Sequence, residues 1–362
     1  MYVDEQMRDR LDEAVSSTNA RNFIDSLPVC IPGIVAAVLS AIVFARLRQT
    51  SLEVLLCGLS LFDVILLTSS IMIYPSMNEC SRIHEPVERH QSLVCHFFWR
   101  STVSIFPLSL IAQAGSVWTY VAVTVDRFIA VSFPLKKRVW STRSTSTTVL
   151  ICITVISAIF KLPSFFEVKL DENGEVGPTE LRKNPFYIEF YLFYLYVALI
   201  QIIPWTLIIF LNAIVIHKVR LAYRSQETMV LKSNAPRAKR EDAERKVTVM
   251  ATVMTGIFII CNIPPGINYL VDRFSEKSVY RQRIPLSNLL VCVNSASNMM
   301  IYCVFNSRFR NAALKLIGLR RDINNRNGSL TNRTAREETL GILKSRAGTF
   351  DNISTKSAPT PC

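Results

Sequence analysis

The sequence predicts an all-α membrane protein: a seven-transmembrane helix bundle followed by a short amphipathic surface helix after the seventh span. Three observations lead to this prediction. Half of the 362 residues are hydrophobic, the apolar residues are gathered into seven long blocks, and basic residues are concentrated in every second connection between blocks. A soluble protein of this length would instead alternate polar and apolar faces along its elements.

Each apolar block is long enough to cross a bilayer, whose hydrocarbon core of about 30 Å needs roughly 20 helical residues. Helices are expected because a backbone in lipid must satisfy its own hydrogen bonds. We take the first block as a span and not as a removable signal, because 26 mostly polar residues precede it. The blocks are 27–45, 54–77, 101–125, 144–160, 190–216, 247–271 and 284–307.

Lys and Arg indicate the orientation, since cytoplasmic segments carry an excess of them. With the N-terminus outside, the inner segments hold 27 Lys and Arg against 12 in the outer segments, whereas 16 acids lie outside and 9 inside. We therefore expect a multi-pass plasma-membrane protein with a cytoplasmic C-terminus. Its predicted regions are an extracellular N-terminus (1–26), the seven-span domain (27–306), the surface helix (307–320) and a disordered cytoplasmic tail (321–362).

Several other classes of function have less support. The formal net charge is +13, but the basic residues are dispersed along a membrane surface, so no nucleic-acid partner is predicted. The four histidines show no metal-ligand spacing, and we predict neither a metal site nor an enzyme. A transporter that uses Asp63 is a weaker alternative, because no internal repeat with broken spans is visible.

Asp63 lies in the middle of the second block, where a charged side chain costs about 3 kcal/mol or more unless it faces a polar interior. Asn294 and Asn298 are four positions apart, so they share one helical face. Together with Ser116 and Ser295 they could hold a small cation such as sodium, or a proton, beside Asp63. The alternative is a set of ordinary interhelical hydrogen bonds. No other cofactor is predicted.

Four short motifs, in this order, resemble those of rhodopsin-class G protein-coupled receptors. They are "LSLFD" ending at Asp63, "DRF" at 126–128, "FPL" at 133–135 and "NSASNMMIY" at 294–302. The resemblance implies that Asp126 holds Arg127 at rest, and that activation frees this guanidinium to meet a heterotrimeric G protein. It also implies that Asn298 and Tyr302 belong to the switch and that Leu135 enters a pocket on the G protein. The alternative for the Asp-Arg pair is an interfacial charge pair that anchors the helix end.

The same resemblance implies a packing connector between ligand pocket and switch, made of Val117, Pro204, Phe258 and Pro264. Pro264 is expected to kink the sixth span, because a proline inside a helix removes a backbone hydrogen bond. The helix after the seventh span is expected to lie among membrane lipids. The Ser- and Thr-containing tail is expected to meet arrestin and a receptor kinase.

Further stretches resemble the invertebrate FMRFamide and related neuropeptide receptors. They are "LPSFFE" at 162–167, "PTELRKNPFY" at 178–187, "CNIP" at 261–264 and the seventh-span motif. The acid of an amine receptor and the lysine of an opsin are both missing, since Ser109 and Cys292 stand at those positions. The resemblance implies an extracellular amidated peptide as the ligand. A chemosensory receptor of the same fold for a small environmental molecule is the alternative.

The acidic outer surface suits a cationic peptide, because its field could steer such a ligand. An amidated Arg-Phe end needs a carboxylate for the guanidinium and an aromatic slot for the ring. The candidates are Glu189, Glu167 and Asp272 for the carboxylate, Gln113 and Asn268 for the terminal amide, and Phe186 and Tyr187 at the rim. Each could equally be an ordinary rim or packing residue.

The outer connections contain two further features. Asn173-Gly174 lies between short extended stretches and predicts a hairpin turn, which could form a flap over the pocket. Cys80 and Cys95 share one outer segment and could form a disulfide there, since the extracellular side permits it. No cysteine lies in 164–187, so the disulfide that the resembled receptors usually form to the third span cannot form.

Overall fold

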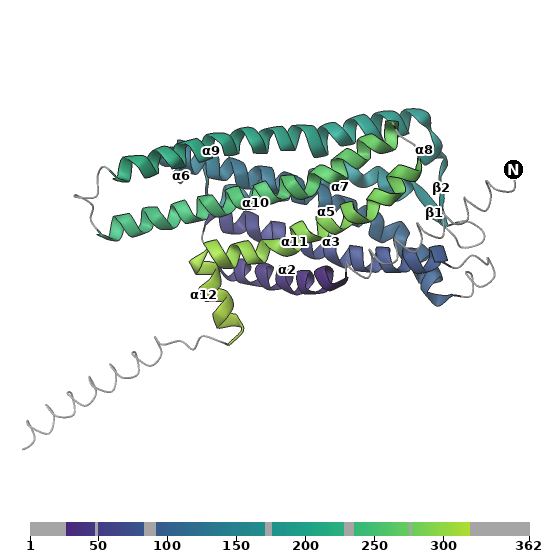
Figure 1. The fold of residues 1–362 in the computed structure, drawn as a ribbon, viewed down its shortest axis with the longest axis horizontal. Coiled ribbons are helices and arrows are strands. Elements are labelled where there is room, and N and C mark those ends of the chain that lie inside the picture. The colour runs from purple at the N-terminus through teal and green to yellow at the C-terminus, as the bar shows by residue number, and fades with distance from the viewer. Residues whose placement is uncertain are drawn as a thin grey trace, which may run out of the picture. The chain divides into compact units, whose positions relative to one another are not determined.

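The structure is a computed structural model, and it describes residues 27–47, 50–82, 92–170, 176–227, 235–274 and 277–318. Seven of the helices in these stretches are long and apolar enough to cross a membrane. Figure 1 shows them running alongside one another as a bundle. The all-α class and the predicted number of spans are therefore confirmed. The predicted terminal regions 1–26 and 321–362 lie outside the described residues.

The spans are longer than the uncharged blocks. One example is the sixth, which begins at Ala235 although its apolar block begins at 247. A helix continues through polar residues because each added residue makes a further backbone bond. In chain order the spans are α2 (Leu27–Leu47), α3 (Ser51–Arg82), α5 (Leu93–Ser132), α7 (Arg143–Lys161), η2 (Tyr187–Leu195) with η3 (Val197–Ile202) and α9 (Ile203–Glu227), α10 (Ala235–Phe274) and α11 (Lys277–Phe305).

Helices α3 and α5 each pack against four other spans. α3 packs against α2, α5, α7 and α11, and α5 packs against α3, α7, α9 and α10. Glycines allow these close approaches, as is usual between helices in lipid. A Cβ atom added to Gly115 would lie 2.5 Å from the ring of Phe62, and one added to Gly58 would lie 2.4 Å from Leu150. The bundle therefore depends on small side chains where α3 meets α5 and α7.

The fifth span changes its hydrogen-bond pattern at its middle. It is π-helical over η2 and η3 and becomes α-helical at Ile203. Pro204 is the next residue. Where the hydrogen-bond pattern changes from π-helix to α-helix, some backbone N–H groups lose their partner. Proline has no N–H group, so its presence at this point reduces the number of unpaired donors. The π-helical part was not predicted from the sequence. In the sixth span, α10 continues through Pro264 and Pro265, and the kink at Pro264 stays a prediction.

Short elements occupy the connections. The third and fourth spans are joined by α6 (Pro134–Trp140), and η1 (Leu162–Phe166) follows α7. Strands β1 (Val168–Leu170) and β2 (Val176–Pro178) then pair antiparallel, with Leu170 opposite Val176, and α8 (Glu180–Lys183) follows. β1, β2 and α8 lie together at one end of the bundle (Figure 1). The extended stretches match the prediction, whereas the turn at Asn173-Gly174 lies outside the described residues.

Helix α12 (Ser307–Leu316) follows the seventh span, at the start of the predicted surface helix 307–320. The side chain of Asn306 accepts hydrogen bonds from the backbone N–H groups of Arg308 and Phe309, both at 3.1 Å. This satisfies two of the donors that a helix start leaves free. The buried ring of Phe309 packs 4.8 Å from Phe44 and 5.3 Å from Tyr302, measured between ring centroids. The first turn is therefore fixed to the end of the bundle.

Candidate functional site

The predicted switch residues are paired. Asp126 and Arg127 lie near the C-terminal end of α5, and both side chains are buried. Arg127 donates from Nε to Asp126 Oδ2 at 3.1 Å, and its Nη2 also contacts this oxygen. A buried guanidinium needs such a partner, because removing a charge from water costs several kcal/mol in effect. The charge of Arg127 is therefore neutralised by the preceding residue of the same helix.

The second oxygen of Asp126 is held by other parts of the chain. Ser51, at the start of α3, donates to Oδ1 at 2.6 Å, and Ser141, which follows α6, also donates to this atom. Ser51 and Ser146 of α7 share a further hydrogen bond. These serines were not predicted from the sequence, because the paired residues are up to 95 positions apart and no local pattern marks them.

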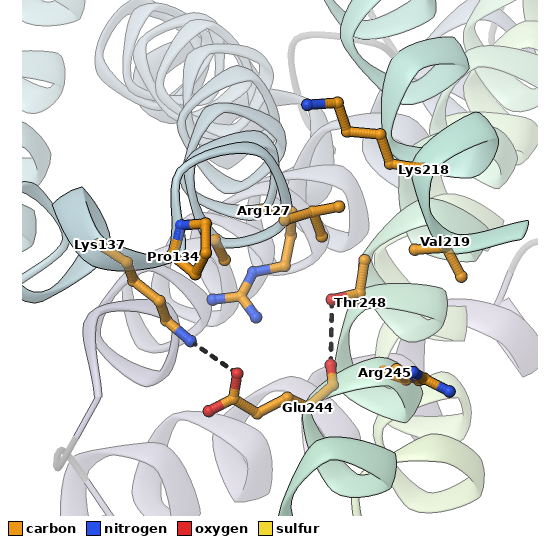
Figure 2. Close-up of a pocket in the computed structure, with 10 residues that line it drawn as sticks. Arg127, Pro134, Lys137, Lys218, Val219, Glu244, Arg245 and Thr248 are labelled. Atoms are coloured by element: carbon orange, nitrogen blue, oxygen red, sulfur yellow. Dashed lines mark hydrogen bonds and ion pairs between the residues drawn. The ribbon is translucent and has the colours of Figure 1, made fainter. Parts of the chain in front are cut away.

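Arg127 lines a cavity of about 360 Å³ that is bordered by residues of α5, α6, α9 and α10. Figure 2 shows its guanidinium directed between Lys137 and Glu244. Lys137 donates to Glu244 at 3.2 Å and so connects α6 to α10. The predicted knob Leu135, on α6, is 86% exposed. The cavity thus combines a buried cation, an ion pair at its edge and an exposed apolar side chain nearby.

Asp63 lies in a buried polar cluster that joins three spans. Asn298 Nδ2 donates to Asp63 Oδ2 at 2.8 Å, and the hydroxyl of Tyr120 donates to Asn298 Oδ1 at 3.1 Å. Asn294 Nδ2 reaches the same hydroxyl at 3.4 Å. The structure therefore brings Asp63, Asn294 and Asn298 together. Tyr120, which links them, was missed. Its signal in the sequence was its place seven positions before Arg127, about two helical turns away on the same face.

Two acceptor atoms of this cluster have no hydrogen-bond partner among the described residues: Asp63 Oδ1 and Asn294 Oδ1. Ser116 and Ser295, predicted as neighbours, are both buried. Free carboxylate and amide oxygens are the kind of ligand that hard cations prefer. The donor set therefore fits a small cation, and a proton on Asp63 would fit it too.

The residues predicted to form the connector lie on three different spans. Phe258 is buried on α10, and the ring of Tyr120 stacks on it with centroids 4.3 Å apart. Val117 on α5 and Pro204 on α9 are buried as well. Tyr302 of the predicted switch is buried, and its ring centroid lies 4.9 Å from that of Phe44. Tyr120 therefore contacts both the polar cluster and Phe258; the connector role stays a prediction.

The predicted ligand contacts have different surroundings. Among the carboxylates, Glu167 is buried and accepts hydrogen bonds from Ser164, Tyr187 and Arg182, whereas Glu189 is exposed. The side chain of Asp272 lies outside the described residues. Of the other candidates, the side-chain amide of Asn268 donates a hydrogen bond to Ser287. The side chain of Gln113 is half-buried, and Phe186 is 72% exposed.

Cys80 and Cys95 form a disulfide, with Cα atoms 5.3 Å apart. The bond joins the end of α3 to the start of α5. Both residues are buried against Trp99. The connection between these two spans is therefore closed covalently.

Comparisons with known proteins indicate a receptor family. Residues 26–320 match the family described as serpentine type 7TM GPCR chemoreceptor Srw. The FMRFamide receptor of Drosophila melanogaster is 26% identical over 306 residues, which are 81% of this chain and 53% of that receptor. The FMRFamide peptide receptor frpr-18 of Caenorhabditis elegans is 29% identical over 299 residues, 78% of this chain and 66% of that receptor. Somatostatin receptor type 1 of Rattus norvegicus is 24% identical over 319 residues, 85% of this chain and 74% of that receptor. The chain thus spans about half of the first relative and just under two thirds of the second.

Proposed function

The chain belongs to the serpentine seven-transmembrane G protein-coupled receptor family Srw, and on this premise we propose that it is a plasma-membrane receptor for an extracellular amidated peptide of the FMRFamide type. The names of two relatives support the ligand class. The excess of acids over bases in the predicted outer segments suits a cationic peptide. The proposed orientation has the N-terminus outside and the C-terminus in the cytoplasm.

The observation that carries the signalling mechanism is the buried Asp126–Arg127 pair beside an open cavity. The bound peptide favours a conformation with a wider cavity, which is a shift between populations that exist without it. Arg127 then leaves Asp126 and turns toward a G-protein segment in the cavity, while Leu135 enters an apolar pocket on the same partner. Opening the cavity separates Lys137 from Glu244, so this ion pair opposes activation in the resting receptor.

A peptide screen tests the ligand. Cells that express the full chain are given a panel of amidated peptides ending in Arg-Phe-amide, and dissociation of the heterotrimeric G protein is recorded. Activation by at least one of these peptides, and weaker activation by the same peptide with a free carboxyl end, is expected. Silence toward all of them, with activation by a small volatile or lipid-like compound, would end the peptide proposal.

A chemosensory receptor for a small environmental molecule is the second candidate. It is favoured by the word chemoreceptor in the family description. Both candidates share the switch and differ only in the ligand, so the peptide screen separates them. The peptide is placed first because the two FMRFamide receptors match about four fifths of this chain.

We also propose that the polar cluster around Asp63 holds a sodium ion in the resting receptor. The free acceptors Asp63 Oδ1 and Asn294 Oδ1 support this. Sodium chloride should then raise the unfolding temperature of the purified receptor above its value in choline chloride, and Asp63→Asn should abolish the difference. An equal unfolding temperature in both salts would count against the ion.

Further partners are proposed for the parts that follow the bundle. The tail holds ten Ser and Thr from Ser329 to Thr360, and we propose it as a substrate of a receptor kinase and a site for arrestin. The helix after the seventh span is proposed to lie among lipid headgroups. Mass spectrometry of the tail after stimulation, with arrestin recruitment recorded in parallel, tests the first proposal.

A further inference from the structure

We infer that the β1–β2 hairpin is fixed to the bundle by a non-covalent clasp centred on the carboxylate of Glu167, which takes the place of a disulfide in this connection. The hairpin clasp consists of Ser164, Glu167, Thr179, Arg182 and Tyr187. Its two halves are the stretches "LPSFFE" and "PTELRKNPFY", which the proposed switch does not use. The inference does not depend on the identity of the ligand.

The carboxylate of Glu167 is buried, with 2% of the residue exposed. Its Oε1 accepts from the hydroxyl of Ser164 at 3.0 Å and from that of Tyr187 at 2.9 Å, and its Oε2 accepts from Arg182 Nη1. Hydrogen bonds to a charged group are about twice as strong as neutral ones. These three donors come from η1, from the start of the fifth span and from the segment after the hairpin, so one carboxylate connects three parts of the chain.

Thr179 closes the base of the hairpin. Its N–H donates to the carbonyl oxygen of Glu167 at 3.0 Å, and its hydroxyl donates to the carbonyl oxygens of Phe166 at 2.6 Å and Glu167 at 3.1 Å. The N–H bond lies directly next to the last strand pair, Val168 with Pro178. Thr179 thereby extends the pairing of β1 with β2 by one step.

Asn184 joins the clasp to the fifth span. Its side-chain oxygen accepts from the backbone N–H groups of Phe186 at 2.9 Å and Tyr187 at 3.4 Å. This is the hydrogen-bond pattern of a residue that caps a helix start. The cap fixes the position of Tyr187, whose hydroxyl then reaches Glu167. The stretch before the fifth span therefore has a structural role at Thr179, Arg182 and Asn184.

The fourth and fifth spans are also tied together next to the clasp. Lys161, the last residue of α7, is buried, and its Nζ lies 4.4 Å from the ring centroid of Tyr196 and 4.6 Å from that of Phe160. The hydroxyl of Tyr191 donates to the carbonyl oxygen of Phe160. A cation over aromatic rings is a favourable contact, more so where water is excluded.

The clasp has a consequence for the loop and for the ligand. β1, β2 and η1 all pack against α5, so the hairpin that the clasp closes lies on the third span although 164–187 contains no cysteine. Because the chain's own donors occupy the Glu167 carboxylate, this residue positions the hairpin and does not receive the guanidinium of a ligand.

Hydrogen exchange of the purified full-length receptor in lipid nanodiscs, without ligand, tests the clasp. Glu167→Gln and Arg182→Gln each remove the charge-assisted bond and should speed exchange of the amides in β1, β2 and α8 about tenfold or more. The double variant should exchange no faster than the faster single variant, since the two residues act as one unit. Matched controls are Glu180→Gln and Lys183→Gln, an ion pair of the same connection whose side chains are 90% and 57% exposed. These two should leave the exchange unchanged.

Unchanged exchange of the hairpin in Glu167→Gln and Arg182→Gln would overturn the clasp, and so would effects that add fully in the double variant. If Glu167→Gln does not fold, Arg182→Gln carries the test, because its side chain is 44% exposed and its replacement leaves Ser164 and Tyr187 on Glu167. Thr179→Val is the third variant, and it should speed exchange in β1 and β2 without changing any charge.

Discussion

At the scale of single residues, the Asp126–Arg127 pair does more than neutralise two opposite charges. Asp126 divides its two oxygens: one holds Arg127, and the other is held by Ser51 and Ser141. The carboxylate is therefore fixed from two other segments of the chain, whereas the hydrogen bonds of the guanidinium to described residues go to Asp126, and the guanidinium lies beside a cavity. We therefore expect Arg127, and not Asp126, to be the member of the pair that moves on activation.

Arg127→Ala should leave surface expression and ligand binding largely intact and abolish G-protein activation. The reason is that in the proposed switch the guanidinium contributes to the state with the G protein bound, whereas in the resting receptor its partner Asp126 keeps two hydroxyl donors. Ligand-stimulated G-protein dissociation measures the effect. Arg138→Ala, an exposed arginine of α6, is the matched control and should keep signalling. Full signalling by Arg127→Ala would contradict the switch.

Tyr120→Phe should destabilise the receptor by about 1–3 kcal/mol. The reason is that the buried side-chain amides of Asn298 and Asn294 lose the hydrogen bonds that they make with the Tyr120 hydroxyl. The change in unfolding temperature can be followed with a thiol-reactive dye, since several free cysteines are buried. Tyr194→Phe is the control, because that side chain is 57% exposed. Equal unfolding temperatures for the two variants would argue against Tyr120 as the link of the polar cluster.

At the scale of elements, contact between spans is set by small residues and by a few bridging side chains. Gly115 lets α5 approach Phe62 of α3, and Gly58 lets α3 approach Leu150 of α7. Glu244 of α10 reaches Lys137 of α6 across the cavity. The glycine contacts are fixed by the shape of the packed side chains. The Lys137–Glu244 ion pair can separate at little cost in free energy, because both side chains are partly exposed.

Gly115→Ala should lower stability by about 1–3 kcal/mol, because the added methyl group overpacks the contact with Phe62. Gly256→Ala is the matched control within a span: nothing lies within 4 Å of its added Cβ, and alanine favours a helix over glycine by about 1 kcal/mol. Thermal unfolding in detergent should therefore show a lower midpoint for the first variant and an equal or higher one for the second. The reverse order would contradict the packing of α3 on α5.

Glu244→Gln should raise ligand-independent signalling by no more than about fivefold, since an exposed ion pair contributes about 0.2–1 kcal/mol. Basal G-protein dissociation at equal surface expression measures this. Asp242→Asn is the control, because Asp242 pairs with Lys246 four positions along the same helix. A fall in basal signalling, or an equal rise in the control, would show that the Lys137–Glu244 pair does not restrain the cavity.

At the scale of the whole molecule, the distribution of charge predicts which side of the membrane each end faces. An epitope at the N-terminus should be accessible to antibody on intact cells, whereas an epitope at the C-terminus should require permeabilised cells. The reason is the excess of Lys and Arg in the segments assigned to the inside, 27 against 12. Both epitopes on one face would contradict an odd number of spans.

The number of spans and their order followed from the sequence because lipid imposes one rule on every residue of a block: about 20 apolar positions in a helix. Three members of the polar cluster, Asp63, Asn294 and Asn298, were also predictable, since polar side chains in the membrane are few and costly. Tyr120, the serines around Asp126 and the Glu167 clasp were not predictable in this way. Each depends on contacts between different elements, 15 and 20 positions apart for Arg182 and Tyr187 of the clasp and 174 and 178 positions apart for Tyr120, for which the sequence gives composition but no distance.

What the sequence alone determined is therefore the fold class, the seven crossings and the identity of Asp126, Arg127 and Asp63 as residues that need a polar partner. The tertiary structure decided which partners they have, and it assigned Glu167 to the hairpin and not to an open rim. The physical reason is range. Burial in lipid acts on each residue independently and leaves a local pattern, whereas a hydrogen bond requires two atoms within about 3 Å, which only the packed helices can bring together.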